Sequence, residues 1–356
     1  MFPVGLGMAV IQAVDSTGSG RLSLAGARPL QCAYGESSMN ETIEHRLQLG
    51  PEWAGQRLDQ AAGELLSDYS RARLQRWIKE GALQLDGRSV KPSQRLSGGE
   101  WLTLQAQLAP ADDEVLPEPL PLELLFEDED LIVLNKPAGL VVHPAAGHAT
   151  GTLQNGLLHH RPELAALPRG GIVHRLDKDT TGVMVVAASL RAHRSLVAQL
   201  QARTMSRIYE CVALGDLPAR GTVDAPIGRH PRDRIRMAVV AGGKPAVTHF
   251  RRLEAFAHFS HLEVSLESGR THQIRVHLQH LGHALAADPL YGRSVRGVKG
   301  LAAEVLTALQ QLQRQALHAR TLRLQHPASE QWQSFDAPLP DDLLALLAAL
   351  READAP

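Results

Sequence analysis

The stretch GIVHRLDKDTTGVMVVA, residues Gly171 to Ala187, places a short polar segment between two apolar runs. The runs GIV and GVMVVA are typical of buried strands, so the intervening HRLDKDTTG is predicted to emerge at an edge of a sheet. Binding and catalytic groups are common on loops of this kind. The carboxylate of Asp177 in this loop is therefore either part of the turn or a chemical reagent.

The bulk composition is that of an ordinary soluble protein. The chain has 356 residues, enough for two domains, with 44% hydrophobic and 21% charged residues. Lys and Arg number 37 against 38 Asp and Glu, so no global positive field indicates a nucleic-acid partner. A local basic strip lies between Ile227 and Arg252, where one acid, Asp233, is outnumbered. This strip either contacts phosphates or is a solvated loop. Its members are Arg229, Arg232, Arg234, Arg236, Lys244, Arg251 and Arg252.

Metal, disulfide and membrane functions find no support in the residues. The two cysteines, Cys32 and Cys211, are far apart and outside any CxxC spacing, which fits a reducing compartment. DKDTTG resembles the opening of a calcium loop, but Ala188 stands where the glutamate should be. No apolar run reaches about 18 residues, and no signal-peptide order is visible. We expect a cytoplasmic protein without metal, cofactor or membrane contact.

The first third of the chain divides into three segments. Residues 1–38 are rich in Gly, Ala and Ser and almost free of charge, so we expect a disordered upstream extension, with Met39 as the natural start. Residues 39–108 indicate two short helices and a strand hairpin that turns at Asp86 and Gly87. Residues 109–120, rich in proline and acids, indicate a linker.

The second helix, predicted within SRARLQRWIKEG, has two distinct faces. Its buried stripe is expected to consist of Leu74, Trp77 and Ile78. The opposite face carries the basic residues Arg73, Arg76 and Lys79. Such a face either binds RNA phosphates or is a solvated surface.

Residues 121–340 alternate irregularly between many short strands and fewer helices, which favours an α+β domain over a doubly wound sheet. One helix is predicted in THQIRVHLQHLG, capped by Thr271 and ended by Gly282. Residues 341–356 are predicted to form an amphipathic C-terminal helix.

Several separated motifs resemble, in the same order, those of the RNA pseudouridine synthases of the RluA superfamily. GTVDAPIGRHP (221–231) and MAV (237–239) resemble its D type, which acts on large-subunit ribosomal RNA. One departure is HALAADPLYG, where Ala284 and Ala287 replace a proline and a glycine of the family pattern, so the local turn is expected to differ. The shared motifs are HRLDKDTTG, NKPAGLVVHP (135–144), SRIYECVALG (206–215), GKPAVTH (243–249), SGRTHQIRVHL (268–278) and RQALHA (314–319).

The resemblance implies a long mixed, mainly antiparallel sheet with a catalytic cleft across its middle, preceded by an alpha-L RNA-binding domain. It implies a monomer that needs no cofactor and converts uridines of large-subunit ribosomal RNA, in the helix 69 stem-loop, to pseudouridine. Two alternatives stay open. One is a paralogue that modifies other ribosomal or transfer RNA, and the other is a non-catalytic ribosome assembly factor.

The resemblance also implies roles for four residues. Pseudouridine formation breaks the uracil–ribose bond and rejoins the base through carbon, which needs a carboxylate; Asp177 in HRLD takes that role. Arg275 is expected to pair with it. Tyr209 is expected to stack on the base and serve a proton transfer. Arg175 is expected to fill the gap that the flipped uridine leaves. Without the resemblance, Tyr209 could equally be a core residue and Arg275 a surface one.

Overall fold

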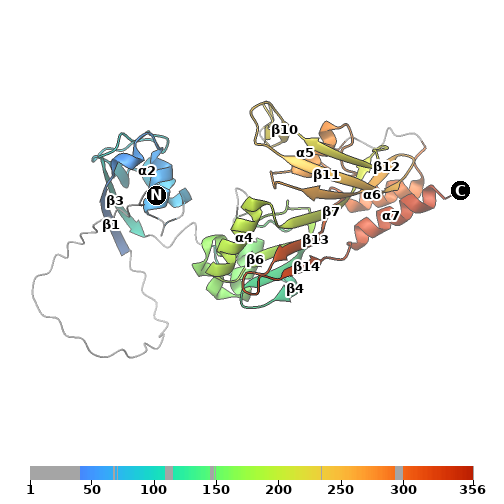
Figure 1. Ribbon diagram of the computed structural model, residues 1–356, viewed down its shortest axis with the longest axis horizontal. Coiled ribbons are helices and arrows are strands. Elements are labelled where there is room, and N and C mark those ends of the chain that lie inside the picture. Colours follow the sequence, from blue (N-terminus) through green and yellow to red (C-terminus); the bar gives the residue numbers. More distant parts are fainter. Residues whose placement is uncertain are drawn as a thin grey trace, which may run out of the picture. The chain divides into compact units, whose positions relative to one another are not determined.

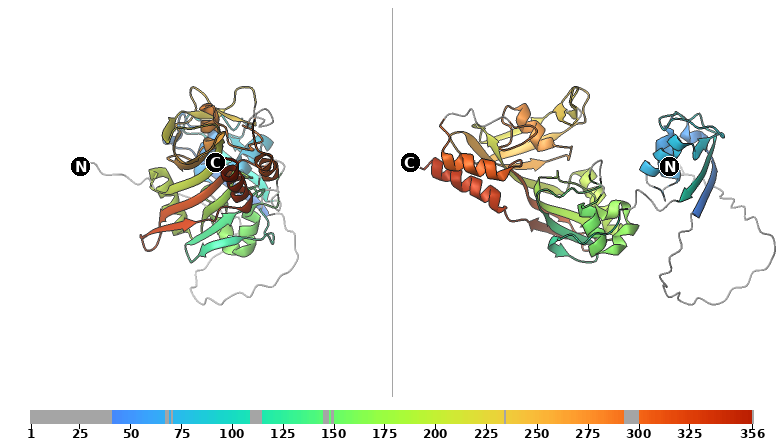
Figure 2. Two further views of the ribbon diagram at one scale, coloured as in Figure 1. Left: turned by 90° about the vertical axis from the view of Figure 1, so that its right-hand side faces the viewer. Right: turned by 180° about the vertical axis from the view of Figure 1, so that it is seen from behind.

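The structure is a computed structural model that describes residues 41–66, 69, 71–108, 115–144, 148, 150–233, 235–292 and 300–355. The expected extension of residues 1–38, half of the predicted linker and Arg234 of the basic strip lie outside these residues. The chain divides into two compact units, Met1–Asp112 and Asp113–Pro356 (Figures 1 and 2). No described helix is long and apolar enough to cross a membrane.

The first unit is a three-stranded antiparallel sheet, in the order β1-β3-β2, covered by two helices. Asp86 (φ 49°) and Gly87 (φ 70°) both have left-handed backbones, and Leu85 and Arg88 exchange two backbone hydrogen bonds of 3.0 Å across them. The predicted two-residue turn is thus confirmed. The elements are β1 (Glu41–Gln48), η1 (Pro51–Trp53), α1 (Leu58–Leu65), α2 (Arg71–Glu80), β2 (Leu83–Leu85) and β3 (Trp101–Leu108).

The amphipathic pattern of α2 is also confirmed. Leu74, Trp77 and Ile78 are at most 6% exposed and pack against α1 and the sheet. Lys79 is exposed, whereas the guanidinium of Arg73 lies over the Trp77 ring, 5.8 Å from its centroid. Burial of the apolar stripe therefore fixes which residues of α2 face solvent.

The second unit is built on a nine-stranded sheet in the order β4-β5-β6-β13-β7-β12-β11-β8, with β14 pairing with β13 beside this path. Among the described strands, β6 and β13 alone run parallel. The expected mixed, mainly antiparallel α+β fold is confirmed. The strands are β4 (Glu123–Glu127), β5 (Leu131–Lys136), β6 (Thr181–Ala187), β7 (Ser206–Leu214), β8 (Arg220–Asp224), β11 (Val247–Ala255), β12 (Phe259–Leu266), β13 (Leu317–Gln325) and β14 (Trp332–Asp336).

Helices cover this sheet, and a small hairpin, β9 (Ile227–Arg229) with β10 (Met237–Val239), lies beside α5 (Figure 1). Every residue of β6 is buried, as expected of a central strand covered on both faces. The helices α6 and α7 pack against each other (Figure 2). The helical elements are α3 (Leu153–His160), η2 (Pro162–Ala166), η3 (Pro168–Gly171), α4 (Leu190–Ala202), α5 (Gln273–His280), α6 (Ala303–Leu312) and α7 (Asp341–Ala353).

Two local predictions are wrong. The run GIV is no strand, because Gly171 (φ 79°) turns the chain against β6 and Ile172 then forms one isolated bridge, with Val186. Thr271 does not cap α5 either. The N-cap is His272, in a left-handed conformation (φ 57°), and it makes no side-chain capping hydrogen bond. The Gln273 side chain accepts the backbone N–H of Arg270, which precedes the helix, at 3.0 Å. Gly282 (φ 91°) does end the helix as predicted.

Candidate active site

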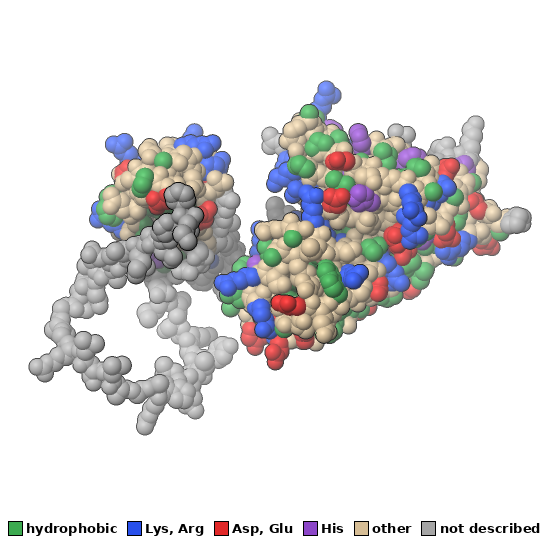
Figure 3. Space-filling view, viewed as in Figure 1, with side chains coloured by type: hydrophobic (Ala, Val, Ile, Leu, Met, Phe, Trp, Pro, Cys, Tyr) green, Lys and Arg blue, Asp and Glu red, His purple; other side chains and the backbone are tan. Residues whose placement is uncertain are grey.

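A cleft of about 660 Å³ opens in the second unit, between the loop that precedes β6, strand β7 and the segment that leads into α5. Six arginines line this cleft against two acids, Asp177 and Glu267. The cleft is therefore strongly cationic, although the net charge of the whole chain is only -1. Figure 3 shows Lys and Arg side chains gathered where this unit is hollowed. Such a field suits a polyanion. The lining cations are Arg169, Arg175, Arg203, Arg207, Arg270 and Arg275.

Asp177 lies on a tight turn that begins at this residue and ends where β6 starts. Its backbone carbonyl accepts from the Thr180 N–H at 3.1 Å, and its side chain is 16% exposed. The fully buried Lys136 donates from Nζ to the Lys178 carbonyl at 2.8 Å, and to two carbonyls of its own loop. The NKPAGL segment thereby fixes the backbone of the Asp177 turn.

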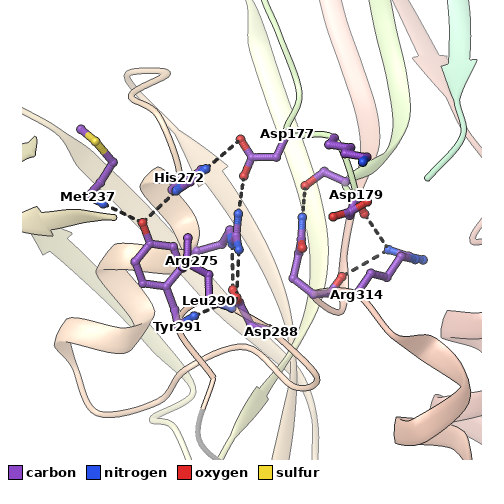
Figure 4. A network of polar contacts seen from close by, with 12 residues as sticks. Asp177, Asp179, Met237, His272, Arg275, Asp288, Leu290, Tyr291 and Arg314 are labelled. Atoms are coloured by element: carbon purple, nitrogen blue, oxygen red, sulfur yellow. Dashed lines mark hydrogen bonds and ion pairs between the residues drawn. The ribbon is translucent and has the colours of Figure 1, made fainter. Parts of the chain in front are cut away.

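The RQALHA segment holds the same turn from the other side. Arg314 donates from Nη1 to the Asp179 carbonyl at 3.4 Å (Figure 4). Gln315 donates to the Thr180 hydroxyl at 2.9 Å. One residue later, the Thr181 hydroxyl bonds His318 Nδ1 at 2.8 Å. Motifs more than 130 residues apart therefore converge to fix the carboxylate of Asp177.

His174 belongs to the scaffold of this loop. Its Nε2 accepts the backbone N–H of Val185 at 3.1 Å, which requires an unprotonated nitrogen. Burial lowers the pKa of His174 to about 3, and the charge of Arg207 acts in the same direction. His174 is thus neutral at physiological pH and shapes the turn, as its position in the loop suggests.

Arg275 joins two carboxylates. Its Nη1 donates to Asp177 Oδ2 at 3.0 Å, while Nε and Nη2 donate to the two oxygens of Asp288 at 2.8 and 2.9 Å (Figure 4). Burial alone would lower the pKa of Arg275, but Asp288 and then Asp177 raise it. The Asp288 side chain is fully buried and also accepts the backbone N–H groups of Leu290 and Tyr291. The charge that faces Asp177 is therefore permanent and fixed in place.

His272 approaches the other oxygen of Asp177. Its Nε2 lies 3.9 Å from Oδ1, and its Nδ1 lies 2.8 Å from the Tyr291 hydroxyl. This hydroxyl also accepts the Met237 N–H at 2.8 Å. In the tautomer in which the hydroxyl donates its own proton to Nδ1, the ring proton lies on Nε2, on the side of Asp177. Burial lowers the pKa of His272, opposed by the charge of Asp177, which agrees with a neutral ring.

Tyr209 and Arg175 border the same cleft. Tyr209 is 7% exposed on β7, and burial raises the pKa of its hydroxyl, which therefore keeps its proton at neutral pH. Arg175 is exposed at the rim and has no ion pair or hydrogen bond with any described residue. The four residues to which the resemblance gives roles thus meet in one cleft: Asp177, Arg275, Tyr209 and Arg175.

The sequence interpretation missed Asp288, His272 and Tyr291. All three lie within segments quoted for the resemblance, yet nothing local marks them as partners of Asp177. The basic strip, by contrast, is less available than the sequence indicates. Arg251 pairs with Glu263, its cross-strand partner on β12, at 2.9 Å, and Arg252 pairs with Asp216, in the segment that follows β7. Both acids are distant from these arginines in sequence.

Two family models match the chain. The RNA pseudouridylate synthase family matches residues 130–280, and the S4 domain matches residues 56–102, where the alpha-L domain is expected. The first match contains the Asp177 turn, Tyr209 and Arg275.

Curated relatives extend this likeness to most of the chain. The ribosomal large subunit pseudouridine synthase D of Pseudomonas aeruginosa is 51% identical over 314 residues, which cover 88% of this chain and 98% of the relative. That of Nitrosomonas europaea is 50% identical over 325 residues, which cover 91% and 92%. Among solved structures, human RNA pseudouridylate synthase domain containing 1 aligns with 65% of this chain and 89% of its own, at 25% identity and a TM-score of 0.50.

Proposed function

Because the chain belongs to the RNA pseudouridylate synthase family and is thus an RNA pseudouridine synthase, we propose that it modifies large-subunit ribosomal RNA, at uridines of the helix 69 stem-loop. The observation that carries this proposal is the 51% identity over 98% of a relative named for that activity. The finer target rests on the GTVDAPIGRHP and MAV segments. The enzyme acts in the cytoplasm as a monomer, without cofactor or metal.

Asp177 is the catalytic carboxylate of this proposal. The reaction breaks the bond between uracil N1 and ribose C1′, turns the base, and joins C5 to C1′ while N1 gains a proton and C5 loses one. Asp177 either adds to C1′ or removes the C2′ proton, and both require an ionised carboxylate. The cation of Arg275, 3.0 Å away, stabilises that charge. The His272 ring lies beside the second oxygen, with its Nε2 3.9 Å from Oδ1.

Tyr209 and Arg175 supply the binding surface for the flipped nucleotide. The ring of Tyr209 offers a face for stacking, and its protonated hydroxyl can take part in the proton transfer. Arg175, exposed at the rim, enters the stack where the uridine has left. Flipping a loop nucleotide costs only a few kcal/mol, so one arginine suffices.

The first unit docks the RNA in this proposal. Its α2 presents Lys79 to solvent, with Arg73 and Arg76 along the same helix. These cations contact phosphates and add affinity without reading sequence.

The test is carbodiimide primer extension on ribosomal RNA from a deletion strain. Wild-type protein is expected to restore pseudouridine in helix 69, and Asp177→Asn to restore none while still binding the RNA. Restoration by Asp177→Asn would refute the catalytic role. Pseudouridine at other positions would identify a paralogue with a different target. A wild-type protein that binds ribosomal RNA yet alters no uridine would support an assembly factor.

A further inference from the structure

Arg207 is a buried arginine of the cleft without a counter-charge. It lies on β7, two residues before Tyr209, and is 8% exposed. Its Nε is buried without a hydrogen-bond partner, and the described residues offer the guanidinium neither an ion pair nor a hydrogen bond. The other arginine buried in this cleft, Arg275, is held by two carboxylates.

Such an arrangement is costly for the fold. Arginine stays protonated at all physiological pH values, and a largely buried charge without a counter-charge destabilises the folded state. The nearby His174 supplies no negative charge, and the Arg207 charge helps to lower the pKa of this histidine. A cost of this kind is typical of a binding site whose ligand supplies the missing acceptors.

The position within the cleft indicates which part of the substrate supplies them. Alternate residues of a strand point to one face, so Arg207 lies on the same side of β7 as Tyr209, the platform proposed for the base. The arginines Arg169, Arg175 and Arg203 also line the cleft and are exposed to solvent, as contacts to an RNA backbone require. The depth of Arg207 thus fits the base rather than a phosphate.

We propose that Arg207 is a further catalytic residue, whose guanidinium binds a carbonyl oxygen of the flipped uracil and stabilises the negative charge on the departing base. This inference rests on the proposed function. When the N1–C1′ bond breaks, its electron pair remains on uracil and spreads from N1 onto the carbonyl oxygens. The electron deficiency that this leaves at C1′ is filled in one of two ways. Either an Asp177 oxygen forms a bond to C1′, or Asp177 removes the C2′ proton and the electron pair of the C2′–H bond forms a C1′=C2′ double bond. A fixed cation beside the oxygens acts where the charge develops.

The experiment compares two bases in single-turnover reactions on a helix 69 stem-loop RNA. One RNA carries uridine at the target, and the other carries 5-fluorouridine, whose fluorine makes the base anion more stable. Loss of the target nucleoside is followed in nuclease digests. Arg207→Met is expected to slow the uridine reaction about 100- to 1000-fold. The fold loss in rate on the 5-fluorouridine RNA should be at least tenfold smaller, because the fluorine already stabilises the anion of that base. RNA affinity should change little.

Two further variants make the test specific. Arg323→Met, which removes an exposed arginine of β13 outside the cleft, is the matched control and should leave both rates unchanged. Gly269→Ala keeps the charge but displaces it, because the added Cβ would lie 2.8 Å from Arg207 Nη1. It should reproduce part of the rate loss, again more with uridine.

Thermal unfolding separates this role from a structural one. Removing an unpaired buried charge should leave the melting temperature of Arg207→Met unchanged or higher. Equal rate losses on both bases, a loss confined to RNA affinity, or a large fall in melting temperature would overturn the inference. If the wild-type protein converts no uridine in this RNA, the proposed target fails, independently of Arg207.

Discussion

Asp288 holds Arg275 through two parallel hydrogen bonds, from Nε to Oδ2 at 2.8 Å and from Nη2 to Oδ1 at 2.9 Å. This leaves Nη1 as the group that meets Asp177. The fork geometry fixes the plane of the guanidinium as well as its position. Asp288 is therefore a positioning residue that acts on the catalytic carboxylate through Arg275.

Asp288→Asn should lower the single-turnover rate about 10- to 100-fold, because Arg275 loses one charged partner and its fixed orientation. RNA affinity should stay within a few fold. The matched control is Asp130→Asn, which breaks a similar bidentate pair with Arg191 outside the cleft. An Asp288→Asn enzyme with the wild-type rate would contradict the positioning role.

The free energy of unfolding should fall on acidification, because His174 is buried in its neutral form and resists protonation in the folded state. The pKa of His174 is lowered to about 3 in the folded state, from 6.5 when unfolded. Between these values the unfolded chain binds more protons, so stability is full above pH 6.5 and declines toward pH 3, by at most about 1.4 kcal/mol per pH unit. Urea unfolding at pH 4 to 7 measures this slope. His174→Gln should flatten it, and the exposed His159→Gln should not.

Ala287 carries a backbone that favours glycine. Its φ is 52°, in the left-handed region, directly before Asp288. Alanine stands here where the family pattern has glycine, and it adopts this left-handed backbone. Ala287→Gly should stabilise the protein by roughly 0.5–1 kcal/mol, as relief of strain outweighs the entropy lost. A differential scanning measurement that shows a lower melting temperature would count against strain at this turn.

The first unit should contribute salt-dependent affinity. Lys79→Ala is expected to weaken RNA binding severalfold and to reduce the slope of log Kd against log salt by about one, as each lost phosphate contact releases fewer ions. Filter binding at several salt concentrations measures both quantities. Lys91→Ala, an exposed lysine of the same unit outside α2, should change neither. Equal effects of the two variants would place the contact elsewhere.

Local patterns sufficed for the features that depend on neighbours in sequence. The stripe of Leu74, Trp77 and Ile78 follows helical spacing, and the turn at Asp86 and Gly87 follows from residues that accept left-handed backbones. The site residues Asp177, Tyr209 and Arg275 were found through motifs, since no single one would be distinguished from a structural residue by its type.

Partners that depend on tertiary structure could not be predicted. Asp288 follows Arg275 by thirteen residues and reaches it only because the chain reverses after Gly282. Arg207 lacks a counter-charge because neither strand that pairs with β7, β12 or β13, places an acidic side chain beside it. The start of α5 at His272, in place of Thr271, likewise depends on the left-handed backbone of His272, which no local pattern indicates.

The placement of β13 in the sheet has a consequence for biosynthesis. This strand, Leu317–Gln325, lies between β6, which follows Asp177, and β7, which carries Tyr209. The two halves of the cleft are therefore joined by a segment that is translated after both of them. A nascent polypeptide that ends before residue 317 leaves both strands without their shared neighbour, so the enzyme gains its activity only once synthesis has passed this point.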